Sequence, residues 1–319
     1  MDKRVYGVLG ISSIMANWNA DFSGFPKTTT KGQFFGSDKA LKFPMKKMWE
    51  EAGEKVLNIK SFTVSKPDKN GAVFLVPRTL KERYEYIFGV EDMKKDKDIK
   101  VILKNLFSAI DVKNFGSTFA EADANISITG AVQIGQGFNL YNGSETQEQN
   151  ILSPFKDPKA AEKNKEGKDA KNSTLGTKIV SDEAHYFYPF VINPRVYDSF
   201  EQLGVTEGYT EEDYQKFKEA ALKGTTSFAT NSKVGCENEF GLFIETEPTL
   251  YLPNLDRYVT FIKGAEKNIQ VNVKELLHDI KDRVLFAEIH YNPHTTEIAS
   301  DIEGVKYFDI FTGKEIEKQ

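Results

Sequence analysis

The chain has 319 residues, of which 39% are hydrophobic and 28% are charged, a composition typical of a folded protein with a substantial core and not of a disordered one. The formal net charge of −5 excludes a generally basic surface, so any nucleic-acid site must be a local stripe. The single cysteine cannot form an internal disulfide, which favours a reducing cytoplasm. No stretch approaches the roughly 20 apolar residues of a membrane-spanning helix, so we expect no membrane association.

The N-terminal part predicts a strand, a polar loop and a helix. Residues 4–15 are apolar enough for a buried strand, and residues 37–52 carry apolar side chains at helical spacing. Pro44 lies inside the predicted helix, where it removes one hydrogen bond, so we expect a kink.

This strand, loop and helix suit a phosphate-binding site. Ser37 is a favourable N-cap, and the free backbone amides behind a cap attract phosphate oxygens. Lysines in the loop and on the helix add positive charge without sequence discrimination; they are Lys27, Lys31, Lys39, Lys42 and Lys46. The alternative is an ordinary capped surface helix with solvated lysines.

Two other side chains near the end of the first strand have open interpretations. Trp18 either stacks on a base or fills core space. Asp21 is an acid whose general-acid role would need a partner that the sequence does not show. There is no Walker or G-x-G-x-x-G pattern, and the four histidines and one cysteine lack zinc-site spacing. We therefore expect no cofactor and no metal.

The middle of the chain predicts mixed structure. Residues 56–64 and 72–76 predict strands joined by a turn, which indicates a hairpin. Residues 79–89 and 98–110 predict amphipathic helices. Residues 126–134 alternate strongly between apolar and polar and predict a central strand.

A lysine-rich stretch follows over residues 156–178, with few apolar side chains, and indicates a flexible insertion. Its flanks, 144–153 and 176–188, can pair as an extended hairpin arm. This second basic element is either a disordered loop or a segment that orders on binding.

The C-terminal part predicts a helix and several strands. Thr210 to Asp213 has the pattern of a capping box and opens a helix that should end before Gly224. The remaining predictions are strands at 240–245, 285–291 and 305–311 and an amphipathic helix at 271–284.

The chain resembles the CRISPR-associated backbone subunit of type I Cascade complexes, a crRNA-binding member of the RAMP superfamily, most closely in its type I-B branch. Three groups of residues carry the resemblance and keep the family's order: Asn17-Trp18-Asn19 with Gly36–Lys42, Phe115-Gly116-Ser117 with Ile128–Gln133, and Thr226-Ser227-Phe228 with Asn231-Ser232-Lys233.

The resemblance implies an α+β fold. It implies a single domain over residues 1–319 with an RRM-like (ferredoxin-like) palm. Helical finger insertions would lie at 79–110 and 205–235, and a β-hairpin thumb at 144–180.

The resemblance also implies the function of a non-catalytic subunit in cytoplasmic antiviral defence. Copies would polymerise head to tail along one guide RNA (crRNA) as a helical filament and present the spacer to a target DNA strand. Other Cascade subunits and the effector helicase-nuclease would be further partners. Because phosphate contacts carry no sequence information, one subunit can accept any guide, and base pairing reads the target.

The residues that would contact guide RNA by this resemblance are Asn17, Asn19, Lys27, Lys31, Ser37, Lys39, Lys42, Lys46, Gln133, Asn231 and Lys233. Ile151 and Leu152 are candidates for the wedge that pushes one nucleotide out at regular intervals. The alternative is a type III-like backbone subunit that cleaves target RNA with a loop acid, Asp21.

Overall fold

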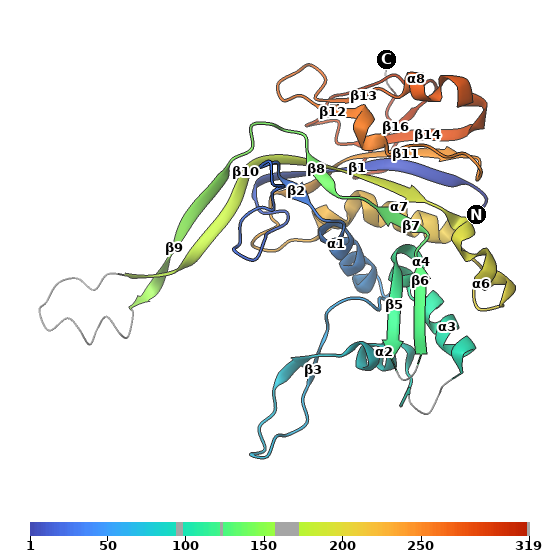
Figure 1. Ribbon diagram of the computed structural model, residues 1–319. Coiled ribbons are helices and arrows are strands. Elements are labelled where there is room, and N and C mark those ends of the chain that lie inside the picture. The colour runs from blue at the N-terminus through green and yellow to red at the C-terminus, as the bar shows by residue number, and fades with distance from the viewer. Residues whose placement is uncertain (94–97, 122–123, 157–171, 318–319) are drawn as a thin grey trace, which may run out of the picture.

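The computed structural model describes residues 1–93, 98–121, 124–156 and 172–317. Its centre is a sheet with the strand order β16-β14-β11-β1-β10-β8-β2, in which β7 and β9 also pair with β10 (Figure 1). The strands of this path are β1 (Arg4–Ala16), β2 (Phe35–Gly36), β8 (Gly137–Asn139), β10 (Asn172–Ile192), β11 (Cys236–Thr246), β14 (Val284–Tyr291) and β16 (Lys306–Asp309). The strands expected at 4–15, 240–245, 285–291 and 305–311 are therefore confirmed.

β1 is the middle strand and pairs antiparallel with β10 and β11. Val5 and Leu9 face one hydrophobic core, whereas Tyr6 and Val8 face another. Burial on both faces explains why the strand is a continuous apolar run and does not alternate.

Long helices cover one face of the sheet, and short strands and short helices of the C-terminal part cover the other (Figure 1). The helices are α1 (Asp38–Glu51) and α7 (Glu211–Ser227). Ser37 caps α1, since its Oγ accepts from the Ala40 amide at 3.3 Å. The helix continues through Pro44 as one element, so the proline does not end it.

The capping box of α7 is confirmed. Thr210 Oγ1 accepts from the Asp213 amide at 3.1 Å, and Asp213 Oδ2 accepts from the Thr210 amide at 2.8 Å. The expected end before Gly224 is wrong, because the helix runs on to Ser227. A Cβ at Gly224 would lie 3.2 Å from the Met45 Cα, so this glycine permits close approach of α7 to α1. Since α7 also packs on β11, much of the segment 205–235 belongs to the core.

A second group of elements projects below the sheet (Figure 1). It consists of β3 (Phe62–Val64), β4 (Leu75–Pro77), α2 (Leu80–Phe88), α3 (Ile99–Ser108), α4 (Ile110–Phe115), β5 (Gly116–Glu121) and β6 (Ala124–Thr129). β3 and β4 form the expected hairpin in a shorter form, and α2 and α3 are the two expected helices.

The expectation of one central strand over 126–134 is wrong. β6 ends at Thr129 and pairs with β5 in a separate two-stranded sheet, whereas β7 (Val132–Ile134) pairs with β10 in the main sheet. The break falls at Gly130, where a Cβ would lie 2.2 Å from the Phe115 carbonyl carbon. The alternation of β6 instead reflects a two-stranded ribbon with one buried face.

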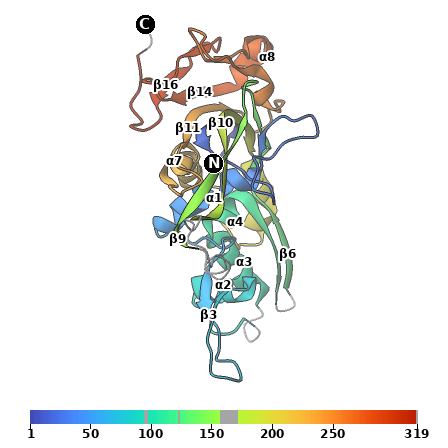
Figure 2. The same cartoon turned by 90° about the vertical axis from the view of Figure 1, so that its left-hand side faces the viewer.

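β9 (Thr146–Lys156) and β10 pair antiparallel and extend away from the body as a hairpin arm (Figures 1 and 2). β10 has 21 residues, and it pairs with β9 up to Ser181 and with β1 from Ser181 onward. The pairing of the two flanks is as expected. The middle of the lysine-rich insertion, residues 157–171, lies outside the described residues.

The expected amphipathic helix over 271–284 is confirmed only in part, because its helical turns are short and irregular. The chain there forms the end of β13 (Ile269–Val271), then α8 (Lys274–Leu277) and the 3-10 helix η3 (His278–Arg283). β13 pairs with β12 (Val259–Phe261) and β15 (Ile298–Ser300), so Val271 belongs to a strand and the helical turns begin at Lys274. The remaining short helices are η1 (Pro194–Tyr197), α6 (Asp198–Gln202) and η2 (Leu255–Tyr258). In the described part of the chain, no helix has the length and apolar character needed to cross a membrane.

Candidate nucleic-acid interface

The loop after β1 lies against the base of the arm. Asn17 Nδ2 donates to the carbonyls of Gly24 at 2.9 Å and of Ile179 at 3.1 Å, and Ile179 is part of β10. The Asn17 amide donates to the Ser232 carbonyl at 3.0 Å. Three segments far apart in sequence therefore meet at one place, and Asn17 joins them.

Asn19 joins this loop to the start of α1. Its Oδ1 accepts from the Ser37 amide at 2.9 Å, and its carbonyl accepts from the Lys27 amide at 2.9 Å. Asn17 and Asn19 thus organise the backbone around the lysines.

Lys233 is directed inward. Its Nζ donates to the carbonyls of Asn17, at 2.7 Å, and of Trp18, and it lies 5.2 Å from the centre of the Trp18 ring. Burial lowers the pKa of Lys233. This lysine holds the loop in place, and its neighbour Asn231 is exposed on the adjoining turn.

Trp18 is buried, with 1% of its surface exposed. Its Nε1 donates to the Tyr188 hydroxyl at 2.5 Å. The interpretation as a core residue is therefore confirmed, and no ring face is open to a base.

The five lysines of the predicted site fall into two groups. Lys42 pairs with Asp38 at 2.9 Å, and Lys46 pairs with Asp111 at 3.3 Å and donates to the Asn58 carbonyl. Lys27, Lys31 and Lys39 have no carboxylate partner among the described residues. Lys31 and Lys39 are exposed, and Lys27 is half-buried, so these three carry the positive charge that a phosphate could meet.

Gln133 lies away from this group. It is on β7 opposite Val191, near the end of β10 that is remote from the arm, and its Nε2 donates to the Gly130 carbonyl at 2.8 Å. The structure does not bring it to the lysines.

Ile151 and Leu152 lie on β9, opposite Gly176 and Thr174. Their exposed fractions are 39% and 63%. Both apolar side chains are therefore available to a partner.

Asp21 is exposed, and its Oδ1 accepts from the amides of Ser23 at 2.8 Å and Phe25 at 3.0 Å. The carboxylate thus shapes its own loop. Within the described residues no group of three or more His, Cys, Asp or Glu side chains could hold a metal ion.

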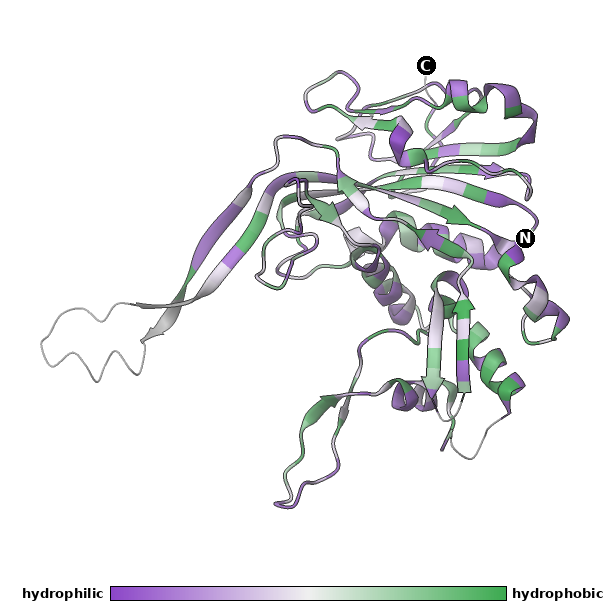
Figure 3. Ribbon diagram, viewed as in Figure 1, coloured by the Kyte–Doolittle hydropathy of each residue, from purple (hydrophilic) through white to green (hydrophobic). Residues whose placement is uncertain are grey.

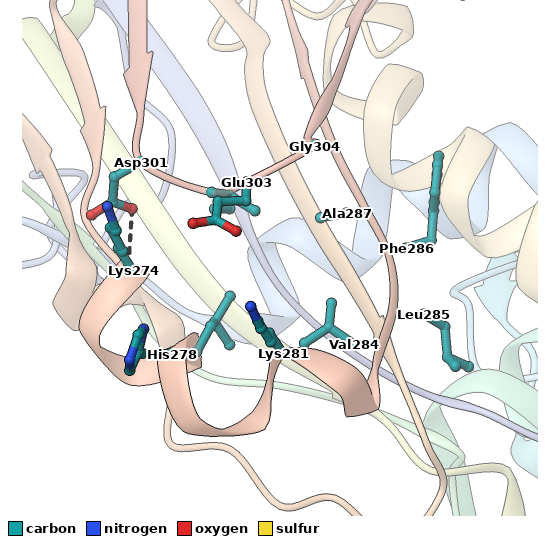
Figure 4. Close-up of a pocket in the computed structure, with 12 residues that line it drawn as sticks. Lys274, His278, Lys281, Val284, Leu285, Phe286, Ala287, Asp301, Glu303 and Gly304 are labelled. Carbon is teal, nitrogen blue, oxygen red and sulfur yellow. Dashed lines mark hydrogen bonds between the residues drawn. The ribbon is translucent and has the colours of Figure 1, made fainter.

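Cavities also lie elsewhere, and two of them hold several titratable side chains. The first, of about 250 Å³, is in the C-terminal part, where Lys274, His278 and Lys281 face Glu303 across an apolar floor (Figure 4). Its other acid, Asp301, accepts from the amides of Val273 and Lys274, which is a structural role.

The second cavity, of about 350 Å³, is lined by residues of β1, β10, β11 and β12. We call it the acidic cavity because Glu183, Glu237 and Glu239 line it, together with one lysine, Lys263, which pairs with Glu183. His185 Nδ1 lies 2.9 Å from both Glu239 oxygens, and Nε2 lies 3.1 Å from Glu183 Oε1. The Phe261 ring stacks on His185 with 3.8 Å between ring centres. Sequence reasoning missed this cluster because only Glu183 is a local neighbour of His185.

Burial alone would lower the pKa of His185, but the carboxylates of Glu239 and Glu183 raise it above its ordinary value. Because the folded pKa exceeds the unfolded one, the stabilisation is fully present below about pH 6.5 and is lost as pH rises through the folded pKa. His185→Gln should therefore lower the free energy of unfolding at about pH 5.5 and much less at about pH 9. Urea unfolding at both pH values measures this, with the exposed His278→Gln as control. An equal loss at both pH values would contradict it.

The fold is similar to that of a solved chain from a CRISPR RNA-guided surveillance complex. A chain of a "CRISPR RNA-guided surveillance complex, pre-nicking" aligns with a TM-score of 0.52 at 13% identity, over 94% of this chain and 96% of that chain. A chain of a "CRISPR RNA-guided surveillance complex" aligns at 13% identity over 92% and 94% of the two chains, with a TM-score of 0.44. The family model for CRISPR-associated protein Cas7 matches residues 3–285, and the chain belongs to this family. No curated protein sequence matches the chain.

Proposed function

We propose that this protein is a non-catalytic backbone subunit that binds guide RNA in a type I CRISPR surveillance complex, with the type I-B branch as the nearest. The observation that carries the proposal is the β9–β10 arm, which projects beside a lysine-bearing loop in a member of the Cas7 family (Figure 1).

The strand order supports an RRM-like palm. β11, β1, β10 and β8 are consecutive in the sheet, with neighbouring strands antiparallel. α1 follows β1 and α7 follows β10 in the chain, and both pack in the same core. This order supports the proposed ferredoxin-like palm, in which residues 79–110 would be a finger-type insertion and residues 144–180 the thumb.

Lys27, Lys31 and Lys39 form the proposed phosphate grip, on the backbone that Asn17, Asn19 and Ser37 organise. Lys42 and Lys46 would join it only by leaving Asp38 and Asp111. Lysines neutralise phosphates as point charges and do not discriminate sequence.

Ile151 and Leu152 on the arm are the proposed wedge against the RNA of a neighbouring copy. A head-to-tail contact is heterologous and therefore makes an open filament. Linked binding of many copies converts a weak local grip into a tight assembly. Target DNA, other Cascade subunits and the effector helicase-nuclease complete the proposed set of partners in the cytoplasm.

The test is purification of the protein with and without a guide RNA, followed by absorbance ratio and particle mass. The proposal expects salt-sensitive RNA retention and long particles, and shorter particles for Ile151→Asp with Leu152→Asp. A monomer that retains no RNA under any condition would overturn it. Metal-dependent cleavage of complementary RNA that Asp21→Ala abolishes would instead identify the type III-like alternative.

A further inference from the structure

The β3–β4 hairpin (residues 60–78) has an apolar face that no other described residue covers. Phe62 pairs with Pro77 and Val64 with Leu75 across the two strands, so these four side chains share one face. All four are exposed, with 62% for Val64 and 71% for Leu75, whereas Thr63 and Val76 on the other face are half-buried. Figure 3 shows the hydrophobic colour along β3.

The rim of this face is basic. Residues 60–78 contain four basic residues and one acid. Lys60 lies 5.0 Å from the centre of the Phe62 ring, and Lys66 and Lys69 are exposed at the tip. The one acid, Asp68, accepts from the amides of Asn70 and Ala72, so it closes the turn. In a chain with a net charge of −5, the hairpin is a local positive and apolar surface.

The acidic cavity has the complementary chemistry. Glu237 is exposed and has no cationic partner among the described residues. Ile14 lines the cavity and is exposed, and the neighbouring Met15, Val234 and Ile262 are exposed as well. Glu183 and Glu239 are paired with Lys263 and His185, so Glu237 is the carboxylate at this cavity that can meet a cation. An apolar surface with an unpaired carboxylate at its edge thus matches an apolar surface with a basic rim.

One molecule cannot join the two surfaces. β3 lies at the bottom of the molecule, whereas β12, whose Phe261 lines the acidic cavity, lies at the top, with the central sheet and its helices between them (Figure 1). When one surface of a copy binds a different surface of the next copy, the contact is heterologous. Such a contact can be repeated from copy to copy and builds an open filament.

We infer that the β3–β4 hairpin of one copy docks on the acidic cavity of the next copy in the filament, an inference that rests on the proposed function. The occupant is a second copy of this chain. Aliphatic side chains dominate the apolar face, and Lys60 lies over the Phe62 ring, so the surface offers little area for stacking of bases.

The test separates contacts between copies from binding of RNA. Lys66→Glu with Lys69→Glu should raise the protein concentration needed for assembly on a long RNA on the order of tenfold, by placing like charges together. Glu237→Lys alone should do the same, and the three substitutions combined should restore assembly. Affinity for an RNA that holds only one copy should stay unchanged throughout. Lys274→Glu with Lys281→Glu is the charge-matched control on the C-terminal cavity.

A second pair of variants probes the contact directly. In a Cys236→Ser background, a Leu75→Cys chain mixed with a Glu237→Cys chain should form a disulfide-linked heterodimer on long RNA and in concentrated RNA-free protein. Leu203→Cys, at another exposed leucine, is the control in place of Leu75→Cys.

The outcomes distinguish the docking contact from RNA binding by the hairpin and from failure of the proposed function. Unchanged assembly in the charge variants together with no cross-link would overturn the docking contact and leave RNA binding intact. Lost affinity for the short RNA would assign the hairpin to nucleic acid and overturn the contact as well. A wild-type protein that binds neither the long RNA nor the short RNA would refute the proposed function. The docking contact would still be tested, because the disulfide in RNA-free protein would support it and its absence would contradict it.

Discussion

Replacement of Lys27, Lys31 and Lys39 with glutamate is expected to lower affinity for single-stranded RNA by on the order of a hundredfold or more, because the proposed phosphate grip is lost and replaced by repulsion. Each phosphate contact contributes about 0.7 to the slope of log affinity against log salt for a single strand, so the slope should fall by about 2. Fluorescence anisotropy over a salt series measures both quantities.

The control replaces three other lysines, Lys100, Lys104 and Lys314, which are exposed elsewhere on the molecule. It gives the same change in net charge without touching the loop or α1. If both triple variants lose affinity equally, RNA binding follows net charge and the local grip is refuted.

Asp111→Ala is expected to lower the free energy of unfolding by about 3–5 kcal/mol. Asp111 is completely buried and accepts from the amides of Leu57 at 2.7 Å and Asn58 at 2.8 Å. It also pairs with Lys46, whose ammonium group would be left in a mostly buried site. Removal leaves the two amides without their acceptor and takes the paired carboxylate from Lys46. Urea unfolding followed by tryptophan fluorescence measures the loss.

Asp38→Ala is the comparison, since Asp38 pairs with Lys42 at a more exposed site and should cost no more than about 1 kcal/mol. If Asp111→Ala proved as mild, Lys46 would not depend on this carboxylate and would be free to bind phosphate. The two substitutions therefore test which lysines of α1 are structural.

The sequence predicted those elements that are determined by residues within or next to the element itself. β1 follows from a continuous apolar run, and the start of α7 follows from the Thr210 capping box. The ends and breaks depend on contacts with distant residues. Gly224 continues a helix because α1 packs against it, and Gly130 breaks a strand because the backbone at Phe115 approaches it.

The candidate site shows the same division. The sequence indicated the loop and the N-cap correctly, because Ser37 caps α1 through its own neighbours. It did not distinguish the lysines with structural partners from those available to phosphate. Lys46 pairs with Asp111, and Lys233 donates to the carbonyls of Asn17 and Trp18. Pairing with a residue far along the chain leaves no signal in spacing.

The unbroken course of β10 from the core into the arm has a mechanical consequence. Its residues from Ser181 to Ile192 are paired with β1, and those toward Gly176 are paired with β9, while the register shifts fall only near the outer end, between Asn172 and Gly176. The root of the arm therefore has no hinge, and its direction is fixed when the sheet folds. In a row of identical copies, the protein and not the RNA would then set the distance from one arm to the next. This distance would be the same for every pair of neighbouring copies.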